Sequence, residues 1–163
     1  MDQGYKTLGF VVIALLYLVV GIMAARGTIA SFRKLFTPKV EQIFYAMFLI
    51  GVAALYLAFM AYFGAGDAWK LEGTVVAGFV VIALLGMRLP SALIAGYSMH
   101  GLWDLVHELQ AHGGLSAFGP GQLTAIPLAY GMFCAAFDFY MAVYFYQRRA
   151  EWSTGRNRTA PAG

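Results

Sequence analysis

The chain has 163 residues, of which 61% are apolar and 12% are charged. An average soluble protein is about 45–50% apolar and about 25% charged, so this composition argues against a soluble globular domain and against a disordered chain. The net charge of +3 is too small and too scattered for a nucleic-acid-binding surface. The single cysteine excludes an intramolecular disulfide and any site that needs several thiolates. Together these observations predict a polytopic membrane protein.

Five apolar segments are long enough, or nearly so, to cross a bilayer as helices. A hydrocarbon core about 30 Å thick requires roughly 17–25 apolar residues per helix. The third segment is short and ends at Arg88-Leu89-Pro90, which predicts a tight turn because Pro does not continue a helix and restricts the residue before it. Ser91 is the expected cap of the helix that follows. We therefore predict an all-α membrane bundle with helices over 8–25, 43–63, 73–87, 91–109 and 123–146.

Basic residues are distributed unequally between the two sides that five spans create. One side holds only Lys6 and Lys70, whereas the other holds Arg26, Arg33, Lys34, Lys39, Arg88, Arg148, Arg149, Arg156 and Arg158. Because cytoplasmic loops are enriched in Lys and Arg, this distribution predicts an outside N-terminus and a cytoplasmic C-terminus. The expected organisation is one transmembrane domain over 1–146 and a polar, disordered cytoplasmic tail over 147–163. The predicted location is a cell membrane, of the bacterial inner-membrane type.

The fourth predicted helix carries four ionisable residues on one face, namely His100, Asp104, His107 and Glu108. At 100° per residue these four positions lie within an arc of about 100°. An Asp at the centre of a membrane helix costs roughly 2.5–3.5 kcal/mol, whereas each Leu or Ile returns only about 0.3–0.6 kcal/mol. This helix therefore inserts poorly by itself, and we expect its polar face to be buried against protein, water or a ligand.

The fifth predicted helix offers a matching polar stripe of Tyr130, Cys134 and Asp138, which are spaced four apart. At a rise of 1.5 Å per residue, His100 lies about 13 Å from the outer end of its helix. Cys134 lies about 16 Å and Asp138 about 22 Å from the outer end of the antiparallel fifth helix. We therefore expect a polar cluster that spans these two helices.

Several kinds of chemistry suit such a cluster. Two imidazoles and a carboxylate are a ligand set for iron, zinc or copper, and the candidate metal ligands are His100, Asp104, His107 and Glu108. Donors at positions i, i+4 and i+7 rise about 10 Å, so we expect two of them, completed by Asp138 or Cys134, to share one ion. A haem held axially is the alternative, with His100, Tyr97 and Cys134 as the cofactor-binding candidates.

Metal-free chemistry is equally open at this stage. Acid–base catalysis on a lipid-soluble substrate would use His100, Asp104, His107 and Asp138. A proton relay toward the outside would use the polar face of the fourth helix. The same face also suits a structural clasp that bridges helices, and Glu41 is expected to be an interfacial charge.

Two motifs resemble a family of small uncharacterised bacterial integral membrane proteins. They are the run His100-Gly-Leu-Trp-Asp104-Leu-Val-His107-Glu108 and, after Pro127, the run Cys134-Ala-Ala-Phe-Asp138. The family pattern is H-x-x-W-D-x-x-H-H, a proline-containing loop and C-x-x-x-D in the last helix, and it covers residues 90–146. This chain departs from it at Glu108, where the family carries a second His, which weakens a metal role that needs adjacent histidines. The resemblance implies that the fourth and fifth helices pair, but it implies no reaction.

Three functional hypotheses follow from the sequence. The first is a membrane-embedded enzyme or a metal- or haem-binding protein that acts on a hydrophobic or lipid-like small molecule. The second is a non-catalytic subunit of a larger membrane complex, and the third is a proton-coupled transporter, which would require a homo-oligomer. Membrane lipids are expected partners in each case, and nucleic acid is not.

Overall fold

The computed structural model describes residues 2–64, 66–115 and 117–157. Within these residues the chain is all-α, with five helices, one short 3₁₀ helix and no strand. The elements in chain order are α1 (Asp2–Leu35), α2 (Pro38–Phe63), η1 (Gly66–Ala68), α3 (Trp69–Gly86), α4 (Pro90–Ala111) and α5 (Tyr130–Asn157).

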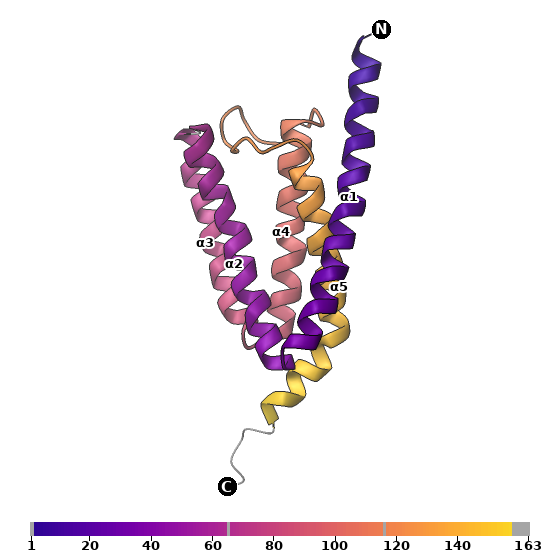
Figure 1. Ribbon diagram of the computed structural model, residues 1–163. Coiled ribbons are helices and arrows are strands. Elements are labelled where there is room, and N and C mark those ends of the chain that lie inside the picture. Colours follow the sequence, from indigo (N-terminus) through magenta and orange to yellow (C-terminus); the bar gives the residue numbers. More distant parts are fainter. Residues whose placement is uncertain (1, 65, 116, 158–163) are drawn as a thin grey trace.

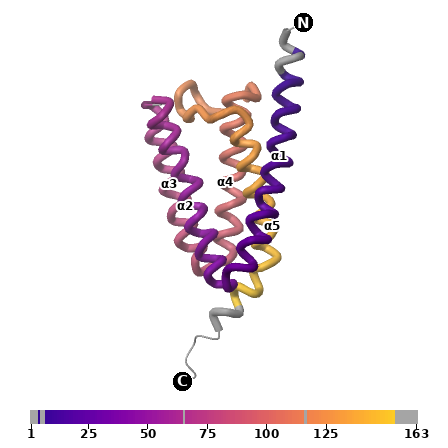
Figure 2. The backbone as a smooth tube through the Cα atoms, in the orientation of Figure 1, coloured from indigo at the N-terminus to yellow at the C-terminus, as the bar shows by residue number. Residues whose placement is uncertain are grey.

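The helices run alternately up and down and form two packed pairs with one peripheral helix (Figure 1). The α2–α3 hairpin packs against α4, and α4 makes its most extensive contact with α5. Helix α1 lies along the outer side of α5, and its N-terminal part extends beyond the ends of the other helices (Figure 1). The segment between α4 and α5, described over residues 112–115 and 117–129, reaches from α4 toward the adjacent end of α3 (Figure 2). We call this segment the 112–129 connection.

Three of the helical segments are long and apolar enough to cross a membrane, namely Thr7–Leu35, Pro38–Phe63 and Gly66–Gly86. Much of the exposed surface of α1 is apolar, including Leu15 at 56% and Leu16 at 58% exposure. In water such a surface would be unfavourable, so this pattern indicates a membrane protein.

The predicted tight turn between the third and fourth helices is confirmed. Helix α3 ends at Gly86 and α4 begins at Pro90, and the N–H of Leu89 donates to the carbonyl oxygen of Leu85 at 2.8 Å. The prediction that Ser91 caps α4 is wrong, because the cap residue is Leu89 and it makes no side-chain capping bond. Pro90 instead occupies the first turn, where its missing N–H costs no intrahelical hydrogen bond.

Several helix boundaries differ from the predicted ones. Helix α1 continues to Leu35 and α2 begins at Pro38, so both extend past their apolar runs into polar sequence. Helix α5 begins at Tyr130 rather than at position 123, because Pro127 lacks an N–H and Ala129 has a positive φ of 63° that interrupts helical geometry. The helix then continues through Asn157 where a disordered tail was expected, and residues 158–163 lie outside the described part of the chain.

Glycines allow the closest approaches between α5 and its neighbours. A Cβ atom on Gly131 would collide with the backbone carbonyl of Asp104, so the start of α5 lies directly against α4. A Cβ atom on Gly21 would collide with the carbonyl of Phe133, which places α1 equally close to α5. The contact at Gly131 brings the polar faces of α4 and α5 together.

Candidate functional site

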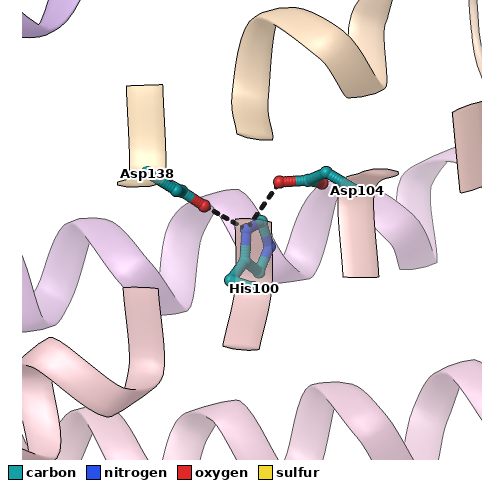
Figure 3. A group of neighbouring side chains, drawn as sticks. All are labelled: His100, Asp104 and Asp138. Carbon is teal, nitrogen blue, oxygen red and sulfur yellow. Dashed lines mark hydrogen bonds and ion pairs between the residues drawn. The ribbon is translucent and has the colours of Figure 1, made fainter. Parts of the chain in front are cut away.

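Three buried side chains from α4 and α5 form what we call the His100 centre, defined as His100, Asp104 and Asp138. Nδ1 of His100 lies 2.6 Å from Oδ2 of Asp138 and 3.0 Å from Oδ2 of Asp104. Figure 3 shows the two carboxylates approaching the same ring nitrogen from opposite sides. The polar cluster that the sequence predicted between these two helices is therefore confirmed as a structural contact.

A single ring N–H cannot point at two carboxylates equally well. The 2.6 Å separation makes Asp138 the hydrogen-bond acceptor of Nδ1–H, whereas the 3.0 Å approach of Asp104 is a close polar contact, since its Oδ2 has no hydrogen-bond partner among the described residues. The other oxygen of Asp104 accepts a hydrogen bond from the hydroxyl of Tyr56 at 2.5 Å. Tyr56 belongs to α2, so the centre connects three helices.

The second ring nitrogen of His100, Nε2, differs from Nδ1 in its hydrogen bonding. Nε2 is buried and has no hydrogen-bond partner among the described residues. The imidazole is bordered by the rings of Phe79 and Tyr56, with centroids 5.0 Å and 6.0 Å away. His100 and Asp138 also line a cavity of about 100 Å³ whose other walls are Phe48, Val52, Phe133, Cys134 and Phe137. A buried imidazole whose Nε2 has no hydrogen-bond partner among the described residues thus borders a largely apolar cavity.

A second cluster, which we call the His107 centre, consists of His107, Glu72 and Thr124. Nε2 of His107 lies 2.8 Å from Oε1 of Glu72, and the same oxygen accepts the backbone N–H of Thr124 at 2.9 Å. Nδ1 of His107 lies 2.9 Å from the carbonyl oxygen of Trp103, and the indole N–H of Trp103 reaches Oε2 of Glu72 at 3.4 Å. The His107 centre therefore holds α3, α4 and the 112–129 connection together.

The sequence did not predict Glu72 as a partner, because Glu72 lies just before the third apolar run and resembles a residue at a helix end. Its side chain is fully buried in the structure. The sequence also gave no indication that Tyr56 and Thr124, two uncharged residues, contribute to these centres. Tyr56 lies within an uncharged apolar run that contains other aromatic residues, and the backbone of Thr124 contributes through its N–H alone.

The carboxylate of Glu108 is hydrogen-bonded to the start of α5 rather than to either histidine. Its two carboxylate oxygens accept the backbone N–H groups of Ala129 at 2.8 Å and Gly131 at 3.0 Å. The first backbone N–H groups of a helix have no partner within the helix, and the helix dipole favours a negative charge there. Glu108 thus acts as a cap for another helix, although it was predicted as a metal ligand.

Two further predicted positions lie outside the His100 centre. The hydroxyl of Tyr97 donates to the backbone carbonyl of Tyr45 at 2.9 Å, away from His100. Glu41 is fully buried rather than interfacial, and it accepts hydrogen bonds from Tyr144 at 2.5 Å and from Arg148 at 2.8 Å. The expectation of an interfacial charge at Glu41 is therefore wrong.

The predicted ligand sets can be compared with this geometry. Ligand atoms of His100, Asp104 and Asp138 all lie within 4.8 Å of one another, which suits one metal ion. His107 and Glu108, both predicted as metal ligands, are directed to Glu72 and to the start of α5 instead. A haem does not fit beside His100, because the cavity there has a volume of only about 100 Å³.

Sequence comparison places the chain in a family. The model of a family of unknown function (DUF6010) matches residues 13–151. The chain belongs to this family. No curated protein and no solved structure matches the chain. The match agrees with the predicted resemblance to an uncharacterised family, and it covers all the residues of the His100 and His107 centres.

Proposed function

We propose that all five helices span the membrane and that the polar faces of α4 and α5 are turned inward. The 22 residues of α4 are about 33 Å long at 1.5 Å per residue, which matches a hydrocarbon core of about 30 Å. Met99 and Leu102 of α4 and Val143 of α5 are more than half exposed, whereas His100, Asp104 and Asp138 are buried. An apolar outside with a polar inside is the arrangement that a lipid solvent favours. The distribution of basic residues supports an outside N-terminus and a cytoplasmic C-terminus, as in a multi-pass protein of a bacterial inner membrane.

We further propose that the protein is a membrane-embedded enzyme that transfers a proton within a small hydrophobic substrate, with His100 as the acid–base residue. The observation that carries this proposal is the asymmetry of the His100 ring. Its Nδ1 is held by Asp138 and contacts Asp104, while its Nε2 is buried without a partner among the described residues. A hydrogen bond from Nδ1–H to a carboxylate fixes the tautomer that leaves Nε2 as the base.

Each residue of the centre has a distinct role in this proposal. Nε2 of His100 takes a proton from a C–H or O–H group of the substrate and delivers a proton, exchanged with water while it is held on the ring, to another atom of the same molecule, so no further reactant is needed. The imidazolium formed in between is stabilised by the carboxylates of Asp138 and Asp104. Tyr56 is a positioning residue, because its hydroxyl holds the Asp104 carboxylate at 2.5 Å.

The cavity beside His100 limits the substrate. A cavity of about 150 Å³ holds a benzene molecule, so the space of about 100 Å³ admits a smaller, branched or unsaturated hydrocarbon group. Its aromatic and aliphatic walls favour an apolar group. The reacting part of the substrate is therefore expected to be the tip of a lipid-soluble molecule rather than a polar headgroup.

Deuterium exchange tests the proposal without knowledge of the substrate. Purified protein in lipid nanodiscs is incubated in D₂O with the lipid-soluble extract of the host membranes, and mass spectrometry records which compounds gain deuterium. We expect at least one compound to exchange with the wild type and about 10²–10⁴-fold more slowly with His100→Gln. His112→Gln is the matched control, because the His112 ring lies against the carbonyl of Ile126 and outside the centre. Equal exchange with the wild type and His100→Gln would overturn the proposal.

A metal site is the second candidate, and the convergence of three donors in the His100 centre favours it. Carboxylate and imidazole ligands suit zinc, iron or manganese. The metal content of protein purified in mild detergent distinguishes this candidate from metal-free chemistry. Near-stoichiometric metal that is absent from Asp138→Asn would support it, whereas metal-free protein that still catalyses exchange would reject it.

A further inference from the structure

An apolar groove runs along the seam between α1 and α5. Its volume is about 360 Å³, and its walls include Leu18 and Ile22 of α1 and Met132 and Phe139 of α5. On α5 the groove extends from Met132 to Val143, which is about 16 Å along the helix axis. Half of a hydrocarbon core of about 30 Å is about 15 Å, so the groove has the length of one acyl chain in one leaflet.

A polar pocket of about 320 Å³ continues this groove toward the C-terminal end of α5. The two cavities share Tyr140 and Val143 as wall residues, so they adjoin one another. The pocket is lined by Arg33 of α1 and by Arg148 and Glu151 of α5. The seam between α1 and α5 therefore contains an apolar groove that ends among charged side chains.

The lining of this pocket carries charges of both signs. The guanidinium of Arg148 donates one hydrogen bond to Glu41 at 2.8 Å and another to Glu151, while its Nε–H is buried without a partner among the described residues. Arg33 is exposed at the mouth of the pocket. The charged side chains that line the pocket are thus two cations and the carboxylate of Glu151, and the carboxylate of Glu41, which pairs with Arg148, does not line it. A ligand in this pocket meets both a cation that can bind an anionic group and a carboxylate that can bind a cationic one. A ligand that carries both a phosphate and an ammonium group matches this arrangement.

We propose that the α1–α5 seam is a binding site for one zwitterionic aminophospholipid of the phosphatidylethanolamine type. Arg33 and Nε–H of Arg148 bind the phosphate, Glu151 accepts the N–H groups of the ammonium, and one acyl chain occupies the apolar groove. With the C-terminus of α5 in the cytoplasm, this lipid belongs to the cytoplasmic leaflet. None of the residues that line the groove also lines the cavity beside His100, so this site is independent of the proposed catalysis.

Lipid titration of the purified, delipidated protein tests the assignment. Short-chain phosphatidylethanolamine is added to protein in mild detergent, and the rise of the unfolding temperature with lipid concentration gives an apparent Kd. We expect saturable stabilisation by phosphatidylethanolamine, weaker binding of phosphatidylcholine, which lacks ammonium N–H donors, and weaker binding of phosphatidylglycerol, which lacks the ammonium.

Three variants locate the site. Arg33→Ala is expected to weaken phosphatidylethanolamine binding by about tenfold, as for the loss of one charge-assisted hydrogen bond. Lys34→Ala is the matched control, because it removes the same charge from the next exposed position of α1 without altering the pocket lining. Glu151→Gln is expected to abolish the preference over phosphatidylcholine. Val143→Trp fills the junction of the two cavities and is expected to weaken binding with every headgroup.

Two outcomes would overturn the proposal. Equal weakening by Arg33→Ala and Lys34→Ala would mean that only the general surface charge attracts the lipid. Phosphatidylglycerol that binds as tightly as phosphatidylethanolamine would mean that the ammonium is not recognised. Neither outcome affects the deuterium exchange at His100, so failure of this proposal can be distinguished from failure of the proposed catalysis.

Discussion

Two histidines on the same helix, His100 and His107, are buried to the same degree but have opposite surroundings. Both are about 1% exposed. Each nitrogen of His107 faces an oxygen atom, that of Glu72 on one side and that of Trp103 on the other. At His100 two carboxylates approach a single nitrogen and the other nitrogen has no partner among the described residues.

This difference separates a structural function from a chemical one. A buried polar group that has all its hydrogen-bond partners stabilises the fold, and further reaction would break those bonds. A buried polar group without a partner carries a free-energy cost that binding of a ligand or a proton can remove. We therefore assign the His107 centre to fold stability and the His100 centre to chemistry, and four predictions test this distinction.

The largest expected effect is on stability at the His107 centre. Glu72→Ala removes the carboxylate from His107, from the Thr124 N–H and from the Trp103 indole. Loss of one partner of a buried ion pair costs about 3–5 kcal/mol, so the unfolding temperature in detergent should fall sharply. Asp67→Ala is the control, because Asp67 is an exposed acidic residue close by in η1. Similar unfolding temperatures for the two variants would contradict the structural role of Glu72.

The next effect concerns the cap that Glu108 provides for α5. Glu108→Ala leaves the N–H groups of Ala129 and Gly131 without their carboxylate acceptor. At roughly 1.5 kcal/mol for each charge-assisted hydrogen bond, we expect a loss of about 3 kcal/mol. Hydrogen exchange at these two amides should accelerate, and Glu108→Gln, which keeps one acceptor oxygen, should be intermediate. Unchanged protection of both amides in Glu108→Ala would refute the capping role.

A smaller loss of stability is expected at the His100 centre. Tyr56→Phe removes one hydrogen bond to Asp104 and should cost about 1.5 kcal/mol, measured by denaturant unfolding. The proposed proton transfer should slow by more than this small loss of stability suggests, because Asp104 is no longer held against His100. Tyr62→Phe on the same helix is the control, since Tyr62 is 83% exposed. If Tyr56→Phe left proton transfer at the wild-type rate, Tyr56 would have no positioning role.

The last prediction concerns the protonation of the two histidine rings, which is measured by NMR and requires no change in stability. ¹⁵N NMR of histidine-labelled protein at neutral pH should show Nδ1 of His107 protonated, because the Trp103 carbonyl is only an acceptor. For His100 we expect a protonated Nδ1 and an unprotonated Nε2, with His100→Gln used to assign the signals. A protonated Nε2 in His100 would remove the contrast between the two histidines.

The sequence predicted the parts of the fold that depend on local chemistry. The Arg88–Pro90 turn was predicted because the ring of Pro90 restricts the backbone locally. Helical rise and an antiparallel arrangement predicted a polar cluster between the fourth and fifth helices, but they placed Cys134 at the depth of His100 and Asp138 deeper, whereas Asp138 is the residue that contacts Nδ1 of His100. The start of α5 was placed seven residues too early, since apolar residues around Pro127 resemble a helix by composition. Ala129, which has a positive φ, donates its backbone N–H to Glu108 on another helix, a contact that local sequence does not reveal.

The partners of the polar residues were less predictable. Helical spacing placed His100, Asp104, His107 and Glu108 on one face but did not show that this face contacts three different partners. Glu72 and Glu41 lie near the ends of apolar runs, where a charge normally faces headgroups or water. Their burial depends on Thr124 and Arg148, which are distant in sequence and come close only when the helices pack.

The carboxylate of Glu72 also has a consequence for the biosynthesis of the protein. Its partners are His107, which follows 35 positions later, and Thr124, which follows 52 positions later. A ribosome that adds about 5–20 residues per second needs roughly 3–10 s to make the longer of these segments. During that interval the apolar part of α3 has already been synthesised, while Glu72 in its first turn still lacks both partners. In the proposed membrane arrangement, we therefore expect the first turn of α3 to stay in contact with water until α4 and the 112–129 connection have emerged.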